Sequence, residues 1–277
     1  MSTHSLKPNR HFQEFSFFDS EWNNPLAIET KMTSKPILLI LHGLFGGLSN
    51  FDAVVDDLKS DFRMVILSFP FFDQDHLQTI PQLSKYVFRF IESVFPNEPI
   101  HLIGNSLGGQ IAIHLCLHHK DTFVSLILTG SAGLTENSFG CSKPKRFSVE
   151  YIKERVKDVF FSYELDQDSI QSIQDVLINS DQCGRLLKLA RNSKNTHLGH
   201  HLHEIKQPVL LIWGENDDVT PPSVANQFCS SLTNAHLKWI PECGHAPMME
   251  HPSLFATYCH YFLTQQLLTI QHDKNYV

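Results

Sequence analysis

The sequence has no excess of positive charge, no paired-cysteine motif and no long apolar run. Its formal net charge is −7 and its pI is near 6.2, which argues against nucleic-acid binding because that activity needs a concentrated basic surface. No apolar stretch approaches the roughly 18 to 20 residues of a membrane-spanning helix. The six cysteines form no CxxC pair, and MSTHSLKPNRHFQEF at the start lacks the apolar region of a secretory signal. These absences predict a cytoplasmic protein without a membrane span.

Short apolar segments alternate with helix-length amphipathic segments along the 277 residues. Unbroken Ile, Val and Leu runs of this kind are typical of strands buried on both faces. They are found at 36–43, 62–69, 99–104, 123–130, 208–214 and 236–241. Alternation of strands and helices predicts an α/β fold with a mostly parallel sheet. FQEFSFF and PLAIET, near the start, can add antiparallel edge strands, and SLFATYCHYFLTQQLL is expected to form a final helix.

The interval 134–206 interrupts this alternation because it contains no convincing strand. Instead SVEYIKERVKDVFFSY, DSIQSIQDVLINS and GRLLKLARNSK show helical spacing of apolar residues. We therefore expect a core of residues 1–133 and 207–277 that carries a helical insertion at 134–206. Within the insertion, HLGHHLH puts two histidines at helical spacing. A histidine-rich polar segment before a strand is more often surface than a metal site, so no metal is predicted.

A serine lies between two glycines at the end of one expected strand, in PIHLIGNSLGG. A strand, the turn Gly-Asn-Ser-Leu-Gly and then a helix that begins with small residues form the context of a G-x-S-x-G nucleophile elbow. Such a turn lifts the serine above the carboxyl edge of the sheet, next to a helix N-terminus. We therefore predict that Ser106 is a nucleophile.

A serine hydroxyl needs a base, and an imidazole used as a base needs a carboxylate. His245 follows the last expected strand, in IPECGHAPMMEHP, and His251 is its main rival. Asp217 and Asp218 follow a buried strand in LLIWGENDDVTPP. The chain order Ser, Asp, His is the order that this architecture uses. The two aspartates are adjacent, so only one of them can serve His245.

The oxyanion that forms when a serine attacks a carbonyl needs two preorganised N–H donors. The backbone N–H of Leu107, which follows the nucleophile, is one candidate. The second is expected from LHGLFGGLSNF, with Leu44 first and Phe45 as the alternative. His42 in that motif is interpreted as structural. The FPFF cluster at 69–72 is either pocket lining or core.

Taken together, HGLFGG, GNSLGG, WGENDDVTPP and GHAPMMEHP resemble the α/β-hydrolase superfamily in order and spacing, over nearly the whole chain. The resemblance implies an eight-stranded, mostly parallel sheet with helices on both faces, a Ser-Asp-His triad and a helical lid after the sixth strand. The family pattern places the acid four residues before a proline and so selects Asp217. It also leaves Val219 and Thr220 facing the pocket, and Met249 is a further candidate for lining it.

GNSLGG, GSAGL and WGENDDVTP are similar to the meta-cleavage-product hydrolases, which cleave C–C bonds. Those enzymes use a lid arginine and a tryptophan after the catalytic histidine. Here Ala246 and Met249 occupy the histidine loop, and Arg185 is the nearest lid arginine. SFPFFDQD also replaces the family's acidic D-x-P-G-x-G turn.

These residues predict a serine hydrolase that forms an acyl-enzyme on a small, fairly apolar ester and needs no cofactor. The alternatives are a thioesterase, a C–C bond hydrolase and a ligand-binding protein of the same fold without catalysis. The sequence does not indicate an oligomeric state.

Overall fold

The computed structural model describes residues 12–16, 26–30, 34–45, 48–71, 77–135 and 148–274. An eight-stranded sheet forms its centre, with the spatial order β1-β2-β4-β3-β5-β6-β7-β8. The strands are β1 (Phe12–Ser16), β2 (Leu26–Thr30), β3 (Ile37–Leu41), β4 (Arg63–Leu67), β5 (Ile100–Asn105), β6 (Phe123–Thr129), β7 (Val209–Gly214) and β8 (Ala235–Ile240). Strands β3 to β8 are parallel, and β1 and β2 add an antiparallel edge. The expected mostly parallel sheet is confirmed.

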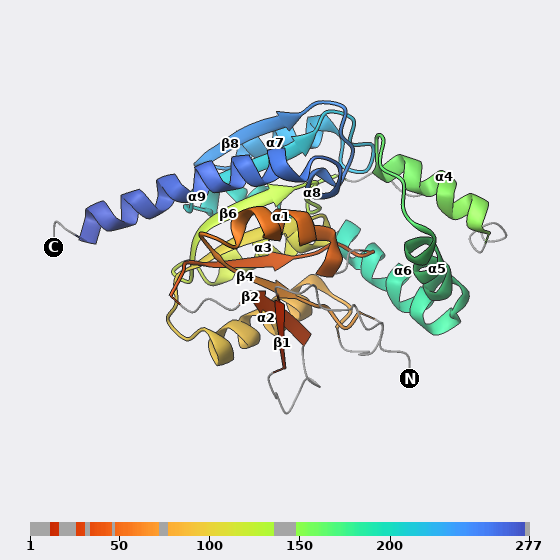
Figure 1. The fold of residues 1–277 in the computed structure, drawn as a ribbon, viewed down its shortest axis with the longest axis horizontal. Coiled ribbons are helices and arrows are strands. Elements are labelled where there is room, and N and C mark those ends of the chain that lie inside the picture. The colour runs from red at the N-terminus through yellow and green to blue at the C-terminus, as the bar shows by residue number, and fades with distance from the viewer. Residues whose placement is uncertain are drawn as a thin grey trace.

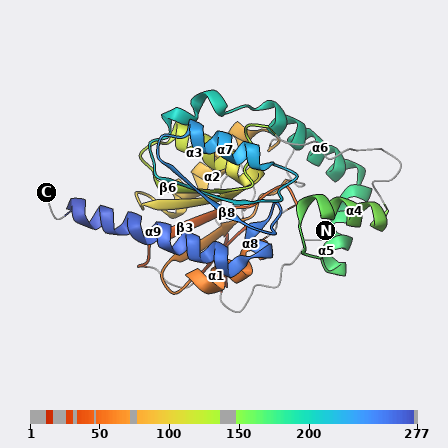
Figure 2. The ribbon, with the colours of Figure 1, turned by 90° about the horizontal axis from the view of Figure 1, so that it is seen from above.

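Helices cover both faces of this sheet (Figures 1 and 2). Along β3 the buried residues alternate: Leu39 and Leu41 pack into one core cluster, and Leu38 and Ile40 into the other. The first cluster is closed by α2 (Ile80–Val94), α3 (Leu107–His118) and α7 (Pro222–Ser231), and the second by α1 (Asp52–Leu58), α8 (Pro247–Glu250) and α9 (Pro252–Lys274). Burial on both faces explains why these strands are uninterrupted apolar runs.

Between β6 and β7 the described chain is helical. It forms α4 (Val149–Val159), α5 (Gln167–Ile178), α6 (Ser180–Asn195) and the 3-10 helix η2 (Gly199–Glu204). Ser148, Asp166 and Asn179 cap the three α-helices by accepting backbone N–H groups. Figures 1 and 2 both show α4, α5 and α6 at one end of the molecule, opposite the end reached by α9.

The structure also bears on the predicted last helix and on the FPFF cluster at 69–72. The last helix continues to Lys274, beyond the segment 253–268 that the sequence predicts. Phe69 and Phe71 are core residues rather than exposed pocket lining, because both are buried and their rings stack with centroids 5.1 Å apart. Phe72 lies outside the described residues. No helix within the described ranges is long and apolar enough to cross a membrane.

Candidate active site

Ser106 lies at the junction of β5 and α3 in a strained backbone conformation, with φ 54° and ψ −120°. Glycines around it let the strand and helix approach closely. A Cβ on Gly104 would lie 2.5 Å from Gly109 Cα, and one on Gly108 would lie 2.0 Å from the Leu41 carbonyl oxygen. No side chain fits at those distances, so the glycine spacing seen in the sequence is a packing requirement of this turn.

Backbone hydrogen bonds hold the strained residue in place. The Ser106 N–H donates to the Thr129 carbonyl at 3.1 Å, and the Ser106 carbonyl accepts from the N–H groups of Gln110 and Ala132 at 3.2 and 3.0 Å. The side chain of the preceding Asn105 donates to the Thr129 and His245 carbonyls at 3.1 and 3.4 Å. These bonds tie the serine turn to β6 and to the loop that carries His245.

His245 and Asp217 form a buried pair at the same edge of the sheet. His245 Nδ1 lies 2.9 Å from Asp217 Oδ2 and 3.1 Å from Asp217 Oδ1. The two side chains are 8% and 0% exposed, so the contact is shielded from water. The neighbouring Asp218 is exposed. The loop therefore directs Asp217, and not Asp218, toward the imidazole.

The Asp217 carboxylate is oriented by its own loop. Its Oδ1 accepts the N–H groups of Val219 and Thr220, both at 2.9 Å, and its Oδ2 accepts the Thr220 hydroxyl at 2.9 Å. Thr220 Oγ1 also lies 3.4 Å from His245 Nδ1. Trp213 fixes the loop by donating its indole N–H to the Thr220 carbonyl at 2.8 Å. This set of donors holds a carboxylate in one orientation.

The other ring nitrogen, His245 Nε2, is buried and has no hydrogen-bond partner within the described residues. The Ser106 hydroxyl therefore does not donate to it in this structure, and contacts of this type commonly tighten only when substrate binds. Gly130 makes room for the imidazole: its φ is 51°, and a Cβ there would lie 2.7 Å from His245 Nδ1. A nitrogen that can accept a proton is thus available near the serine turn.

Two segments offer N–H groups to an anion above Ser106. Leu107 is the first residue of α3, so its N–H has no acceptor inside the helix. Leu44 and Phe45 follow β3 on the HGLF loop, and a Cβ on the adjacent Gly43 would lie 3.1 Å from Ser106 Cβ. Leu44 packs against the core, while Phe45 is 52% exposed. Which of the two supplies the second donor stays a prediction.

His42 stabilises this loop. Burial lowers the pKa of His42 to about 4, so the ring is neutral. Its Nδ1 donates to the Gly43 carbonyl at 2.8 Å, and its Nε2 accepts the Phe69 N–H at 3.4 Å. Phe69 and Phe71 pack edge-on against the ring. These contacts support the structural role that the sequence suggested.

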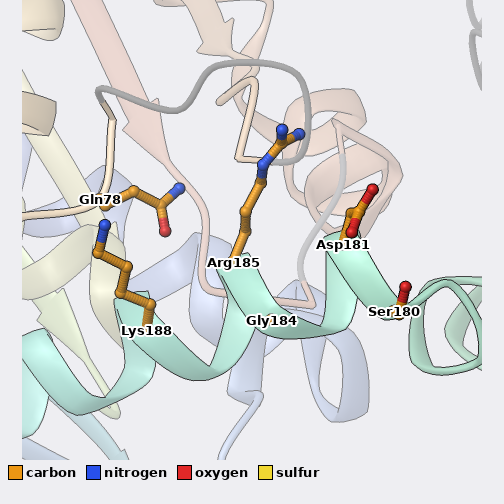
Figure 3. Close-up of a pocket in the computed structure, with 6 residues that line it drawn as sticks. All are labelled: Gln78, Ser180, Asp181, Gly184, Arg185 and Lys188. Carbon is orange, nitrogen blue, oxygen red and sulfur yellow. The ribbon is translucent and has the colours of Figure 1, made fainter.

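The predicted substrate-binding residues come from different segments of the chain. Val219 is buried and its N–H orients Asp217, whereas Met249 is half-buried on α8 and packs against the core. Arg185 lies on α6 and lines a cavity of about 360 Å³ (Figure 3). That cavity is lined by Gln78, Ser180, Asp181, Gly184, Arg185 and Lys188. Ser106, Asp217 and His245 are not among the residues that line it.

Residues 199–203 of the histidine-rich segment 197–203 lie in η2. His201 Nδ1 lies 2.8 Å from Glu204 Oε1, and His197 Nδ1 lies 3.1 Å from the Leu134 carbonyl. Within the ranges that the structure describes, no three His, Cys, Asp or Glu side chains meet in a way that could hold a metal.

Sequence reasoning missed three residues that shape the site. Thr220 was expected to face the pocket, yet its hydroxyl binds Asp217. Gly130 was not singled out, although a glycine directly after a strand is a signal of close approach. Glu250 is the only acidic residue of the motif GHAPMMEHP. Its carboxylate accepts the Gly244 N–H of the histidine loop.

Comparisons with known proteins show the family to which the chain is similar. A family model described as serine aminopeptidase, S33, matches residues 32–252. Human monoacylglycerol lipase ABHD6 is 27% identical over 243 residues, which cover 79% of this chain and 72% of that protein. The 2-hydroxy-6-oxo-6-(2'-aminophenyl)hexa-2,4-dienoic acid hydrolase of Metapseudomonas resinovorans is 26% identical over 250 residues, covering 84% and 85%. The crystal structure of Lip1 from Acinetobacter baumannii AYE has a TM-score of 0.82 at 24% identity and covers 94% of this chain and 93% of that chain.

Proposed function

The chain belongs to the serine aminopeptidase S33 family of α/β-hydrolases, and from this premise we propose that it is a serine esterase with a triad of Ser106, His245 and Asp217. The observation that carries the proposal is the buried pair of His245 and Asp217 beside the strained serine turn. Asp217 accepts a hydrogen bond from the Nδ1–H group of His245, which leaves Nε2 as the basic nitrogen. The substrate is a small, fairly apolar carboxylic ester.

The first half of the reaction forms an acyl-enzyme. His245 Nε2 takes the proton of Ser106 Oγ as the oxygen attacks the ester carbonyl. Asp217 stabilises the imidazolium that results. The N–H of Leu107 and that of Leu44 or Phe45 stabilise the oxyanion. When the C–O bond breaks, Nε2 returns the proton to the leaving alcohol.

Hydrolysis of the acyl-enzyme repeats these steps with water as the nucleophile. Nε2 removes a proton from water, the same N–H groups stabilise the second oxyanion, and Ser106 Oγ leaves with the proton. No step needs a cofactor.

Support for an apolar ester comes from the loops around Ser106. Phe45 places an exposed aromatic ring on the oxyanion loop, and Met249 is half-buried close to the histidine loop. We propose that both, with Val219, contact the acyl or alcohol group. Segment 134–206 then acts as a lid on a core of residues 1–133 and 207–277, because its helices lie at one end of the sheet (Figure 2).

The free cysteines of the described chain suit a reducing compartment, consistent with a cytoplasmic location.

A C–C bond hydrolase is the second candidate. One relative is named as a hydrolase of a dienoic acid, and Arg185 with Lys188 provides positive charge in the cavity of Figure 3. A carboxylate-bearing substrate would match that charge. A thioesterase would use the same triad, so thioesters belong in the substrate screen.

The test of the triad is Ser106→Ala. We expect a folded protein whose ester turnover is lower by several orders of magnitude, on the order of 10³ or more, because the nucleophile is lost. Turnover of p-nitrophenyl esters and labelling by a fluorophosphonate probe measure the effect, and circular dichroism checks folding. Retention of more than about a tenth of the activity would overturn the serine mechanism. A wild-type protein that neither reacts with the probe nor turns over any ester would indicate a ligand-binding role.

A further inference from the structure

The carboxylate of Glu250 joins the histidine loop to the helical segment between β6 and β7. Glu250 is the last residue of α8. Its Oε1 accepts the Gly244 N–H at 2.7 Å, and its Oε2 accepts the N–H groups of Phe161 and Ser162 at 2.7 and 3.1 Å. Gly244 directly precedes His245, and Phe161 and Ser162 follow the end of α4. One side chain thus bridges two parts of the chain that are more than 80 residues apart in sequence.

A second contact joins the same two segments. The His245 N–H donates to the Val159 carbonyl at 2.7 Å, so the backbone of the predicted base is bonded directly to the end of α4. The packing is also tight, because a Cβ on Gly244 would lie 2.4 Å from the Val159 carbonyl oxygen. Figure 1 shows the end of α4 beside the loop that follows β8.

Each carboxylate oxygen of Glu250 serves a different segment. Hydrogen bonds from backbone N–H groups to an ionised acceptor are stronger than those to a neutral one. Cys243, at the start of the same loop, lies 3.8 Å from Oε1 through its Sγ. The helical segment is therefore held against the loop that carries His245 by a charged acceptor and by a main-chain bond.

We propose that Glu250 is a positioning residue that couples docking of α4 to the placement of His245. The inference rests on the proposed triad. When residues 159–162 are docked, the histidine loop is fixed and the imidazole meets Asp217. When that segment moves away, the His245 N–H loses its acceptor, the Val159 carbonyl, and Glu250 Oε2 loses the N–H groups of Phe161 and Ser162. Only the docked state is then expected to catalyse turnover, because movement of α4 changes the position of His245.

Glu250→Gln tests the inference with nearly the same shape. Its amide keeps one accepting oxygen and replaces the other by an NH₂ group, which cannot accept a hydrogen bond. One of the two segments therefore loses its acceptor. We expect kcat to fall roughly 10- to 100-fold, since a displacement of about 1 Å at a catalytic group can cost this much. KM should change by less than about threefold, and the rate of fluorophosphonate labelling should fall as kcat does.

Glu242→Gln is the matched control, because Glu242 is an exposed glutamate on the same loop. It should retain kcat within about twofold. Gly244→Ala is the second variant: its methyl group would push Val159 away and is expected to lower kcat while Glu250 is intact. This variant also serves if Glu250→Gln does not fold.

Three results separate the possible failures. A kcat of Glu250→Gln within about twofold of wild type would overturn the positioning role. The positioning role would also be overturned if the variant unfolds at a lower temperature while its folded fraction is labelled at the wild-type rate. That result would show that Glu250 only stabilises the fold. Full activity of Ser106→Ala would instead overturn the proposed triad, whatever Glu250→Gln does.

Discussion

At the scale of single residues, the site depends on side chains whose conformations are fixed by their neighbours. Ser106 adopts a φ of 54°, a region that costs a non-glycine residue on the order of 1–3 kcal/mol. Its backbone hydrogen bonds with Thr129, Gln110 and Ala132 hold it there. Asp217 is held in a comparable way by Val219 and Thr220. The proposed nucleophile and the proposed acid are thus both held in one orientation, and preorganisation of this kind favours catalysis.

The adjacent aspartates give a prediction at this scale. Asp217→Asn should lower turnover by on the order of 10⁴, because an amide next to Nδ1 favours the wrong tautomer of His245. Asp218→Asn is the control and should cost less than about tenfold, since Asp218 is exposed. Steady-state kinetics on one p-nitrophenyl ester measure both. A larger loss at Asp218 would contradict the assignment, and a small loss at both would place the acid elsewhere.

At the scale of elements, the helices between β6 and β7 are fixed to the core at both ends. Near the second end, Gln110 of α3 donates its amide to the Ser193 and Thr196 carbonyls at 3.0 and 2.7 Å and accepts the Ser193 hydroxyl at 2.5 Å. Asn192 accepts the Ile80 N–H of α2 at 3.1 Å. The first end is fixed at Glu250 and Val159. The part of α6 that carries Arg185 lies between these two anchors.

Arg185→Ala tests whether this region selects substrates. If the protein cleaves carboxylate-bearing substrates, the variant should lower their kcat/KM by about 10-fold or more and change neutral esters by less than about threefold, because only the former meet the guanidinium. Arg191→Ala on the same helix is the matched control, since Arg191 is exposed. Equal effects of Arg185→Ala on both substrate classes would favour the esterase.

At the scale of the whole molecule, buried histidines link stability to pH. Burial lowers the pKa of His42, His101 and His114 from 6.5 to about 4. Between these values the unfolded chain binds protons that the folded protein excludes. The free energy of unfolding therefore rises with pH across this range and falls as the solution is acidified from pH 6.5 toward pH 4.

Urea denaturation at steps from about pH 7 to about pH 4 measures this dependence. His101→Gln should reduce the loss of stability on acidification, because His101 is buried and its Nδ1 lies 2.7 Å from the neutral Ser125 hydroxyl. His236→Gln, an exposed histidine on β8, is the control and should leave the dependence unchanged. An unchanged dependence in His101→Gln would exclude a contribution from His101.

The sequence by itself determined the order of strands and helices and the position of the serine turn. Apolar periodicity is a local property, so it located strands β3 to β8 and the helices between β6 and β7, and it offered the segments of β1 and β2 as edge strands. The glycines around Ser106 are also a local requirement, because β5 and α3 are consecutive and must touch. The residues also indicated His245 and either Asp217 or Asp218 as the predicted partners of Ser106, and the family resemblance then selected Asp217.

Only the tertiary structure decided which side chains meet across long stretches of chain. It pairs His245 with Asp217 through a loop that exposes Asp218, binds the Thr220 hydroxyl to the acid and joins Glu250 to Phe161. It also places Arg185 with Lys188 and Asp181 in the lining of one cavity. These contacts depend on the direction in which a side chain leaves its loop and on how loops pack together, and neither is encoded in the spacing of residues along one segment.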